Sequence, residues 1–351
     1  MKKWYILFLC FVSLNRCQYP VDKSILPEQK RYLVVDADLS ETYSRVNIQY
    51  SINDLGLNGA YGVPRRPGTM SAFYKDSKGN VIQIKKLDGT QDTTIHGKVG
   101  ETYTLYVTAD GNDYISTAET MRPCPDINNV TVQFSKETFR DPDDLYYNGF
   151  DVFSEANDIP NVENFYQWDW IHYEKAVSCA KRTLAEGEVQ ISCNPRDCWD
   201  ITYNTTIMVQ SDNLLDGKIL SHRVARVPFI NPPSKYYLKV EQRSITPNVY
   251  KYLQSLASQT QTVGTLFDLP PQTKFSPNIK NIKNEGESII GVFNVFANRI
   301  KVVYIDMSQK IPNAVSKTIS DPTPFASDPL LSAPCVEGTF RTKIKPIGWI
   351  E

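Results

Sequence analysis

The residue whose position points most directly to chemistry is Cys17, which closely follows a short apolar run. Lys2 and Lys3 precede an apolar stretch of 11 residues, 4–14. A basic start, a short apolar stretch and an early end form the layout of a secretory signal peptide. Such a stretch rises only about 16 Å as a helix, short of a bilayer core of about 30 Å. The sequence predicts a signal peptide over 1–16; a buried N-terminal helix is the alternative.

Cys17 stands where a lipoprotein carries its modified cysteine, with Leu14 suiting the third position before it. The thiol would carry a diacylglycerol and the new amine a further acyl chain, and several chains together anchor stably. Asn15 and Arg16 are bulkier than the small residues usual at this site. We expect lipidation at Cys17 and a lipid-anchored tether over 17–30. Ordinary secretion with a spare thiol, or modification of Cys10, are the alternatives.

Export would place the other cysteines in an oxidising compartment, where disulfides form. Five cysteines follow Cys17: Cys124, Cys179, Cys193, Cys198 and Cys335. An odd number permits two disulfides at most. The disulfide candidates are Cys179, Cys193, Cys198 and Cys335, with a bond inside the cluster 179–198 preferred. The spacing of Cys193 and Cys198 and the lack of a nearby histidine do not favour a zinc site.

Other residue types give no catalytic pattern. His96, His172 and His222 lie far apart, and neither a G-x-S-x-G turn nor a phosphate-binding G-x-x-x-x-G-K loop occurs. Asp141, Asp143 and Asp144 offer oxygen ligands for calcium, but lack the spacing of an EF-hand. A solvated acidic loop is the favoured interpretation. We expect no catalytic residues, no metal and no cofactor.

Aromatic residues are the strongest indication of a binding surface. In a strand over 165–173, Tyr166, Trp168, Trp170 and His172 share one face. Exposed, this ladder would stack on sugars or cover a partner's apolar surface; buried, it would fill a sandwich core. We favour the core for Tyr166 and Trp168, and the rim for Trp170.

A second aromatic group, Tyr146 and Tyr147, precedes Asn148 and Gly149 and suits either a recognition loop or a turn entering a strand. The turn is favoured. The tentative binding residues are thus Trp170, Tyr146 and Tyr147.

Composition describes the scaffold that must position these groups. The chain has 351 residues, 41% hydrophobic and 22% charged, with a formal net charge of −1. It is therefore a folded protein with no basic field to attract nucleic acid. Twenty-two Pro, 17 Gly and 20 Tyr favour β-sheets joined by stiff loops.

Short β-rich runs recur along the chain, with hairpin turns at 76–80 and 110–112. Thr246 is a candidate N-cap for one helix, with Tyr250, Leu253 and Ala257 on one stripe, and a last hairpin is expected around 297–299. A stiff segment at 121–125 suggests a boundary. The expected organisation is an N-terminal β-sandwich, a second β-rich domain and a Pro-rich tail, over 31–122, 123–321 and 322–351.

An ordered set of short motifs resembles one family. Its C-terminal signature is Phe267-Asp268-Leu269-Pro270-Pro271, then Asn278-Ile279-Lys280-Asn281-Ile282, then Gly291-Val292-Phe293; Leu33-Val34-Val35-Asp36 resembles its first strand. Gly100-Glu101-Thr102-Tyr103, Phe165-Tyr166-Gln167-Trp168, Cys198-Trp199 and the helix from Thr246 fit as well. The chain thus resembles domain-of-unknown-function family 4249, predicted lipoproteins of Bacteroidota.

The resemblance implies an exported lipoprotein with an immunoglobulin-like or transthyretin-like N-terminal β-sandwich and a second β-rich sandwich domain. Its members are often encoded beside TonB-dependent outer-membrane receptors. Many members carry a cysteine pair near the end, where this chain has Cys335 alone. The family supplies no catalytic residues to carry over.

We therefore expect a non-enzymatic lipoprotein of the cell outer membrane, bound to the bilayer through Cys17 and acting with a TonB-dependent receptor barrel. Which face of the membrane it occupies stays open. The alternatives are a glycan or peptide hydrolase using carboxylates that sequence does not pair, and a structural subunit of an envelope assembly.

Overall fold

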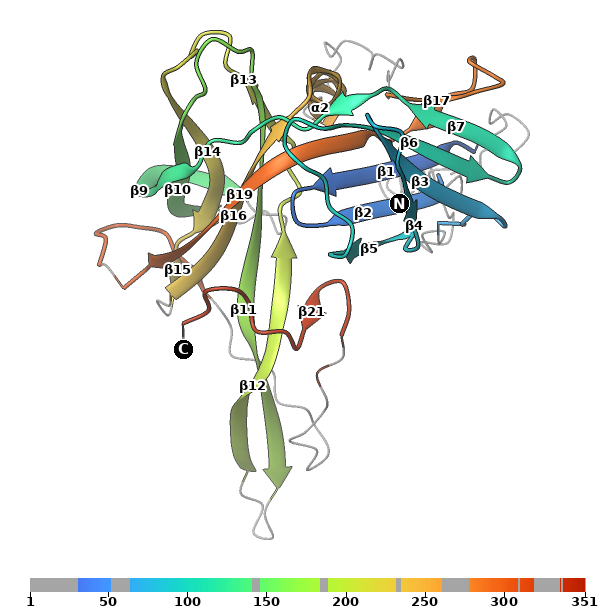
Figure 1. Cartoon of the computed structure of the whole chain (residues 1–351). Helices are drawn as coiled ribbons and strands as arrows, with labels where there is room; N and C mark the ends of the chain where they lie inside the picture. The colour runs from blue at the N-terminus through green and yellow to red at the C-terminus, as the bar shows by residue number, and fades with distance from the viewer. Residues whose placement is uncertain are drawn as a thin grey trace, which may run out of the picture.

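The computed structural model describes residues 31–51, 64–140, 146–183, 189–231, 235–260, 278–308, 310–318, 335 and 337–350. These residues form a mainly β protein with one helix, as expected (Figure 1). Four sheets are present among them. No helix in this part of the chain is long and apolar enough to cross a membrane.

The first unit is a β-sandwich. One layer contains β1 (Leu33–Ser40), β2 (Ser44–Tyr50), β5 (Asp88–Asp92), β18 (Ile289–Ile290) and the start of β19 (Phe293–Asp306). The other contains β3 (Met70–Asp76), β4 (Val81–Ile84), β6 (Thr102–Ala109), β7 (Asn112–Ser116), β8 (Glu119–Thr120) and β17 (Ile279–Asn281). Alternate residues of β6 are buried, because successive side chains of a strand point to opposite faces. The inward faces meet where the Tyr74 ring stacks on Phe293, with 5.5 Å between centroids.

Both predicted hairpins of this unit are confirmed. β3 and β4 join at a turn in which the Asp76 carboxylate accepts hydrogen bonds from the backbone amides of Lys78 and Asn80. β6 and β7 join through Asp110 and Gly111, whose φ angles are +46° and +78°. Two consecutive positive φ angles are what a type I′ hairpin turn requires, so local sequence sets these turns.

The first sandwich is completed by residues far along the chain, which the expected boundary at 122 does not include. β18 and the start of β19 pair in parallel with β1, and β17 pairs with β7. Asn278 fixes this return: its side-chain amide donates to the Phe293 carbonyl at 2.8 Å and accepts from the Phe293 amide at 2.9 Å. The two units are therefore interlocked.

The second unit packs a long sheet against a three-stranded one. The long sheet adds β11 (Phe165–Thr183), β12 (Val189–Tyr203), β13 (Met208–Ser211), β16 (Lys235–Ile245), β21 (Arg341–Thr342) and the rest of β19. The other contains β9 (Ile127–Arg140), β10 (Tyr146–Asn157) and β14 (Ile219–Pro228). β15 (Ile230–Asn231) and β20 (Lys317–Thr318) form a separate parallel pair. Trp168, Val152 and Leu238 are at the centre of the buried core between the layers.

The predicted helix is confirmed as α2 (Pro247–Thr260), which begins directly after Thr246. The Thr246 carbonyl accepts the first helical bond from the Tyr250 amide, but the buried Thr246 hydroxyl makes no hydrogen bond and so does not act as a cap. α2 packs over a third core at the junction of the units: Phe165, Ile245 and Phe296.

The hairpin expected around 297–299 is wrong, because β19 runs through this segment without a turn. The antiparallel ladder with β16 continues from Asp306 to Ala297. Two side chains of the supposed turn are held by partners: Asn298 donates to Glu241 at 2.7 Å, and Arg299 contacts Asp126 and Glu41. A full-length partner strand thus overrides the local preference of Asn for turns.

Gly291 is a position where the fold needs glycine. Its φ angle is +107°, and an added Cβ would overlap the carbonyl group of Val35 on β1. We predict that Gly291→Ala lowers the free energy of unfolding by about 3 kcal/mol or more, because strain and steric overlap add.

The matched control is Gly100→Ala, since Gly100 has a φ of +84° and nothing within 4 Å of an added Cβ. It should cost only about 1 kcal/mol, the strain of the backbone alone. Urea unfolding measures both. Equal losses would mean that the close approach to Val35 does not matter.

The half-buried Asp36 should make stability depend on pH. Burial, and then the neighbouring Asp38, raise its pKa from 3.8 to about 6, against a smaller lowering by Arg45. The folded chain therefore keeps a proton that the unfolded chain releases, so stability falls as pH rises between these two values.

We predict that Asp36→Asn raises the free energy of unfolding by about 2 kcal/mol near neutral pH and has little effect below about pH 4. Urea unfolding at the two pH values measures this. A gain of the same size at both would contradict the assignment.

Candidate functional site

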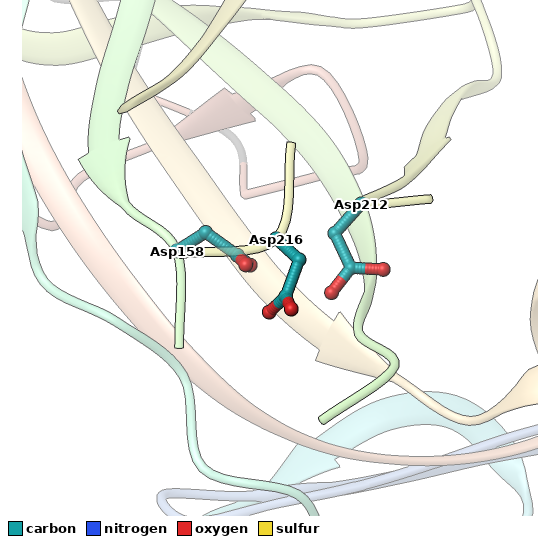
Figure 2. Close-up of side chains that lie close together, drawn as sticks. All are labelled: Asp158, Asp212 and Asp216. Carbon is teal, nitrogen blue, oxygen red and sulfur yellow. The ribbon is translucent and has the colours of Figure 1, made fainter. Parts of the chain in front are cut away.

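An open hollow of about 430 Å³ lies at one end of the second unit, between the loop after β10 and the loop joining β13 to β14. Its lining is polar: Asn161, Val162, Glu163, Asp212, Asn213 and Asp216. Asp158, Asp212 and Asp216 each place a carboxylate oxygen within 4.8 Å of the others. Figure 2 shows the three carboxylates turned toward one another.

Strand ends position these carboxylates. Asp158 directly follows β10, and its amide donates to the Lys218 carbonyl at 3.0 Å. Asp212 follows β13 and extends the ladder to β11 through its amide, which donates to the Asn164 carbonyl. Asp216 precedes Gly217, whose φ is +67°. Three turns that are distant in sequence therefore converge.

The buried carboxylates are already engaged by hydrogen bonds from their own loops. Asp158 accepts from the Tyr166 hydroxyl at 2.6 Å and from the Gly217 amide at 2.9 Å. Asp212 accepts from the amide and the side chain of Asn164, at 2.9 and 3.2 Å. Burial, and then the bond to Asp158, raise the pKa of the Tyr166 hydroxyl, so it remains a donor. Asp158 and Asp212 thus hold the surrounding loops in place through these hydrogen bonds.

Carboxylate oxygens at this spacing are the ligand type that Ca²⁺ prefers. The exposed Asp216 accepts one bond, from the Asn161 amide at 2.8 Å. The contacts of the three carboxylates show a structural role, and Asp216 is the member most open to solvent.

The aromatic face of β11 is covered, as the core interpretation predicted for Tyr166 and Trp168, which are buried. The Trp168 ring stacks on His222 at 4.3 Å, and its indole donates to Gln242. His172 stacks on Tyr236 at 3.7 Å and is buried as well. Trp170 is half-buried against the second core, so it does not form an exposed ladder.

The second aromatic group lies in strand β10 itself. Tyr146 is 56% exposed and stays a binding candidate, whereas Tyr147 is 7% exposed and is thereby removed as one. The side chain of Asn148, next to them, is held by two hydrogen bonds. Its amide nitrogen donates to the Lys136 carbonyl, and its amide oxygen accepts from the Val315 backbone amide. These fixed contacts differ from those of an adaptable loop.

A disulfide joins Cys198 and Cys335, with Cα atoms 5.8 Å apart. Cys198 therefore pairs outside the preferred cluster. Cys179 and Cys193 are opposite each other in the backbone register of β11 and β12, and a bond within the cluster 179–198 stays a prediction. Cys124 is a buried free thiol whose pKa is raised to about 12 by burial, which makes it unreactive.

Several expectations lie outside the described residues: the signal peptide over 1–16, lipidation of Cys17, the tether over 17–30, the acidic loop of Asp141, Asp143 and Asp144, and the first part of the tail, 322–334. The sequence analysis missed the cluster of Asp158, Asp212 and Asp216. Each stands among Asn, Gly and Asp residues typical of turns. This composition identifies the turns but does not indicate that they lie close together in the fold, since more than 50 residues separate Asp158 from Asp212.

A family model described as a domain of unknown function, DUF4249, matches residues 18–301. No curated protein matches the chain.

We predict that Asp158→Asn lowers the free energy of unfolding by about 2 kcal/mol, because it weakens buried bonds to Tyr166 and Gly217. Asp216→Asn, the exposed control, should cost under about 0.5 kcal/mol. Urea unfolding with and without EDTA measures both. If EDTA lowers the free energy of unfolding of the native chain but not of Asp216→Asn, the carboxylates form a cation site and are not merely structural.

Proposed function

The chain belongs to the DUF4249 family, and from this membership we propose that it is an exported lipoprotein of the outer membrane. Its lipid is carried by Cys17. Its role is that of a non-enzymatic binding or accessory component that acts with a TonB-dependent receptor barrel.

The observation that carries the proposal is where the family match starts. It begins at residue 18, directly after Cys17, and leaves the basic and apolar leader outside. A mature lipoprotein begins at its modified cysteine, and here Cys17 is the residue between the leader and the matched domain. The leader pattern and the family start are two separate lines of support.

The engaged carboxylates favour binding over catalysis. Asp158 and Asp212 accept hydrogen bonds from Tyr166, Gly217 and Asn164. A general acid or base needs a carboxyl group within reach of a substrate proton, and these two are turned to their own loops.

The shape of the second unit supports contact with a large partner. The ribbon of β11 and β12 projects beyond the rest of the molecule (Figure 1). Its antiparallel register extends to Thr183 opposite Val189. Near its base, β12 is joined to the C-terminal segment by the disulfide of Cys198 and Cys335. With a net charge of −1, affinity would come from buried apolar and aromatic area.

Replacing the lipidated residue tests the anchor. We predict that Cys17→Ser moves the chain from the detergent phase to the aqueous phase when membranes of the native host are extracted by phase separation, because several acyl chains are lost. Cys124→Ser is the matched control, since Cys124 is a buried thiol. Detergent partition that persists in Cys17→Ser would overturn the anchor.

Purification from native membranes tests the partner. Extraction in a gentle detergent, followed by identification of co-purifying proteins, should recover a large TonB-dependent barrel. Repeated recovery of the chain alone would count against the partnership.

A further inference from the structure

The C-terminal segment 337–350, here called the strap, crosses the long sheet of the second unit from β12 toward β16 and β19 (Figure 1). It is held in place at several points. Arg341 donates to Asp200 at 2.6 Å, the Tyr237 hydroxyl donates to the Ile347 carbonyl, and the Ile350 amide donates to the Tyr304 hydroxyl. Just before it, Cys335 is bonded to Cys198.

The inner side of the strap packs on aromatic rings. Trp349 lies edge-on to Trp199 at 6.0 Å and tilted against Tyr237 at 5.6 Å. Pro346 is buried. The strap is therefore a docked element with a defined inner and outer side.

Its outer side carries large apolar side chains. Phe340, Ile344, Ile347 and Ile350 are exposed by 67, 75, 73 and 61%. Single exposed apolar residues are ordinary on a protein surface, but a group of them indicates an interaction site. Here four fall within eleven residues of a segment whose other side is already buried.

Basic residues alternate with these apolar ones. The strap contains Arg341, Lys343 and Lys345 against one acidic residue, Glu337, and Arg341 is paired with Asp200 at 2.6 Å. The whole chain, in contrast, has 38 basic and 39 acidic residues. Apolar side chains with interleaved lysine and arginine, beside a tryptophan, are the composition of helices that lie at a membrane interface, and the strap shares this composition without being a helix. Anionic headgroups attract the basic residues, while the isoleucines enter the boundary of the acyl chains.

A second copy of the chain fits this surface less well. Most soluble oligomers are symmetric, so strap would meet strap and like charges would be brought together. We propose that the strap is a membrane-contact surface for a bilayer that contains anionic lipids. The contact does not depend on a lipid at Cys17.

The test uses the unlipidated mature chain, residues 18–351, so that Cys17 plays no part. It should co-sediment with vesicles of phosphatidylethanolamine and phosphatidylglycerol. The triple variant I344S/I347S/I350S should bind them about tenfold or more weakly, because it loses the inserted apolar area. The matched control is L214S/I219S/I282S, whose side chains are 87, 66 and 50% exposed elsewhere on the surface. It should bind as the native chain does.

The charge contribution is separable. Lys343→Gln with Lys345→Gln should weaken binding to these vesicles about fivefold per charge removed, and should change little on phosphatidylcholine alone. Thermal unfolding of each variant checks that it is folded.

The proposal is overturned if the native chain binds neither vesicle, or if strap and control variants bind equally. It is also overturned if the strap variant loses only self-association in sedimentation, which would assign the surface to a second copy. A failed anchor would appear only in the Cys17→Ser experiment, so the two proposals fail separately.

Discussion

The fold depends on one strand that belongs to both units. The first residues of β19, from Phe293 to Phe296, pair in parallel with β1, and those from Ala297 to Asp306 pair antiparallel with β16. Side chains of this strand enter all three cores, with Phe293 in the first, Ile305 in the second and Phe296 beneath α2. Because a backbone group of a buried strand must be hydrogen-bonded, neither sandwich can form its ladder without positioning the other.

A buried charge lies at this junction. Arg243 on β16 contacts Glu241 at 2.6 Å and Asp169 at 3.6 Å, and its guanidinium stacks on the Phe296 ring at 4.9 Å. Removing one partner from such a group is costly, since a charge would stay buried without compensation. The arrangement thus admits few alternative registers between β11, β16 and β19. The proposed binding surfaces are carried on this rigid frame.

Those surfaces lie away from the cores. Polar groups near the hollow, such as Asp158 and Asn164, serve the loops that carry them. Tyr146 on β10 and the outer side of the strap are exposed instead. Exposed apolar and aromatic side chains of this kind suit the extended partners proposed above, a membrane or a barrel.

The sequence determined what short-range chemistry controls: the β class, the turns at Asp76 and Gly111, the helix after Thr246, and the burial of Trp168. Each follows from neighbouring residues or from the two-residue period of a strand. Only the tertiary structure decided which distant segments meet: β19 continuing where a turn was expected, Cys198 with Cys335, and the convergence of Asp158 with Asp212. Local conformational preferences of about 1 kcal/mol or less are outweighed when a partner strand supplies a continuous ladder of hydrogen bonds. That partner strand lies far away in the sequence, so the residues around the segment do not reveal it.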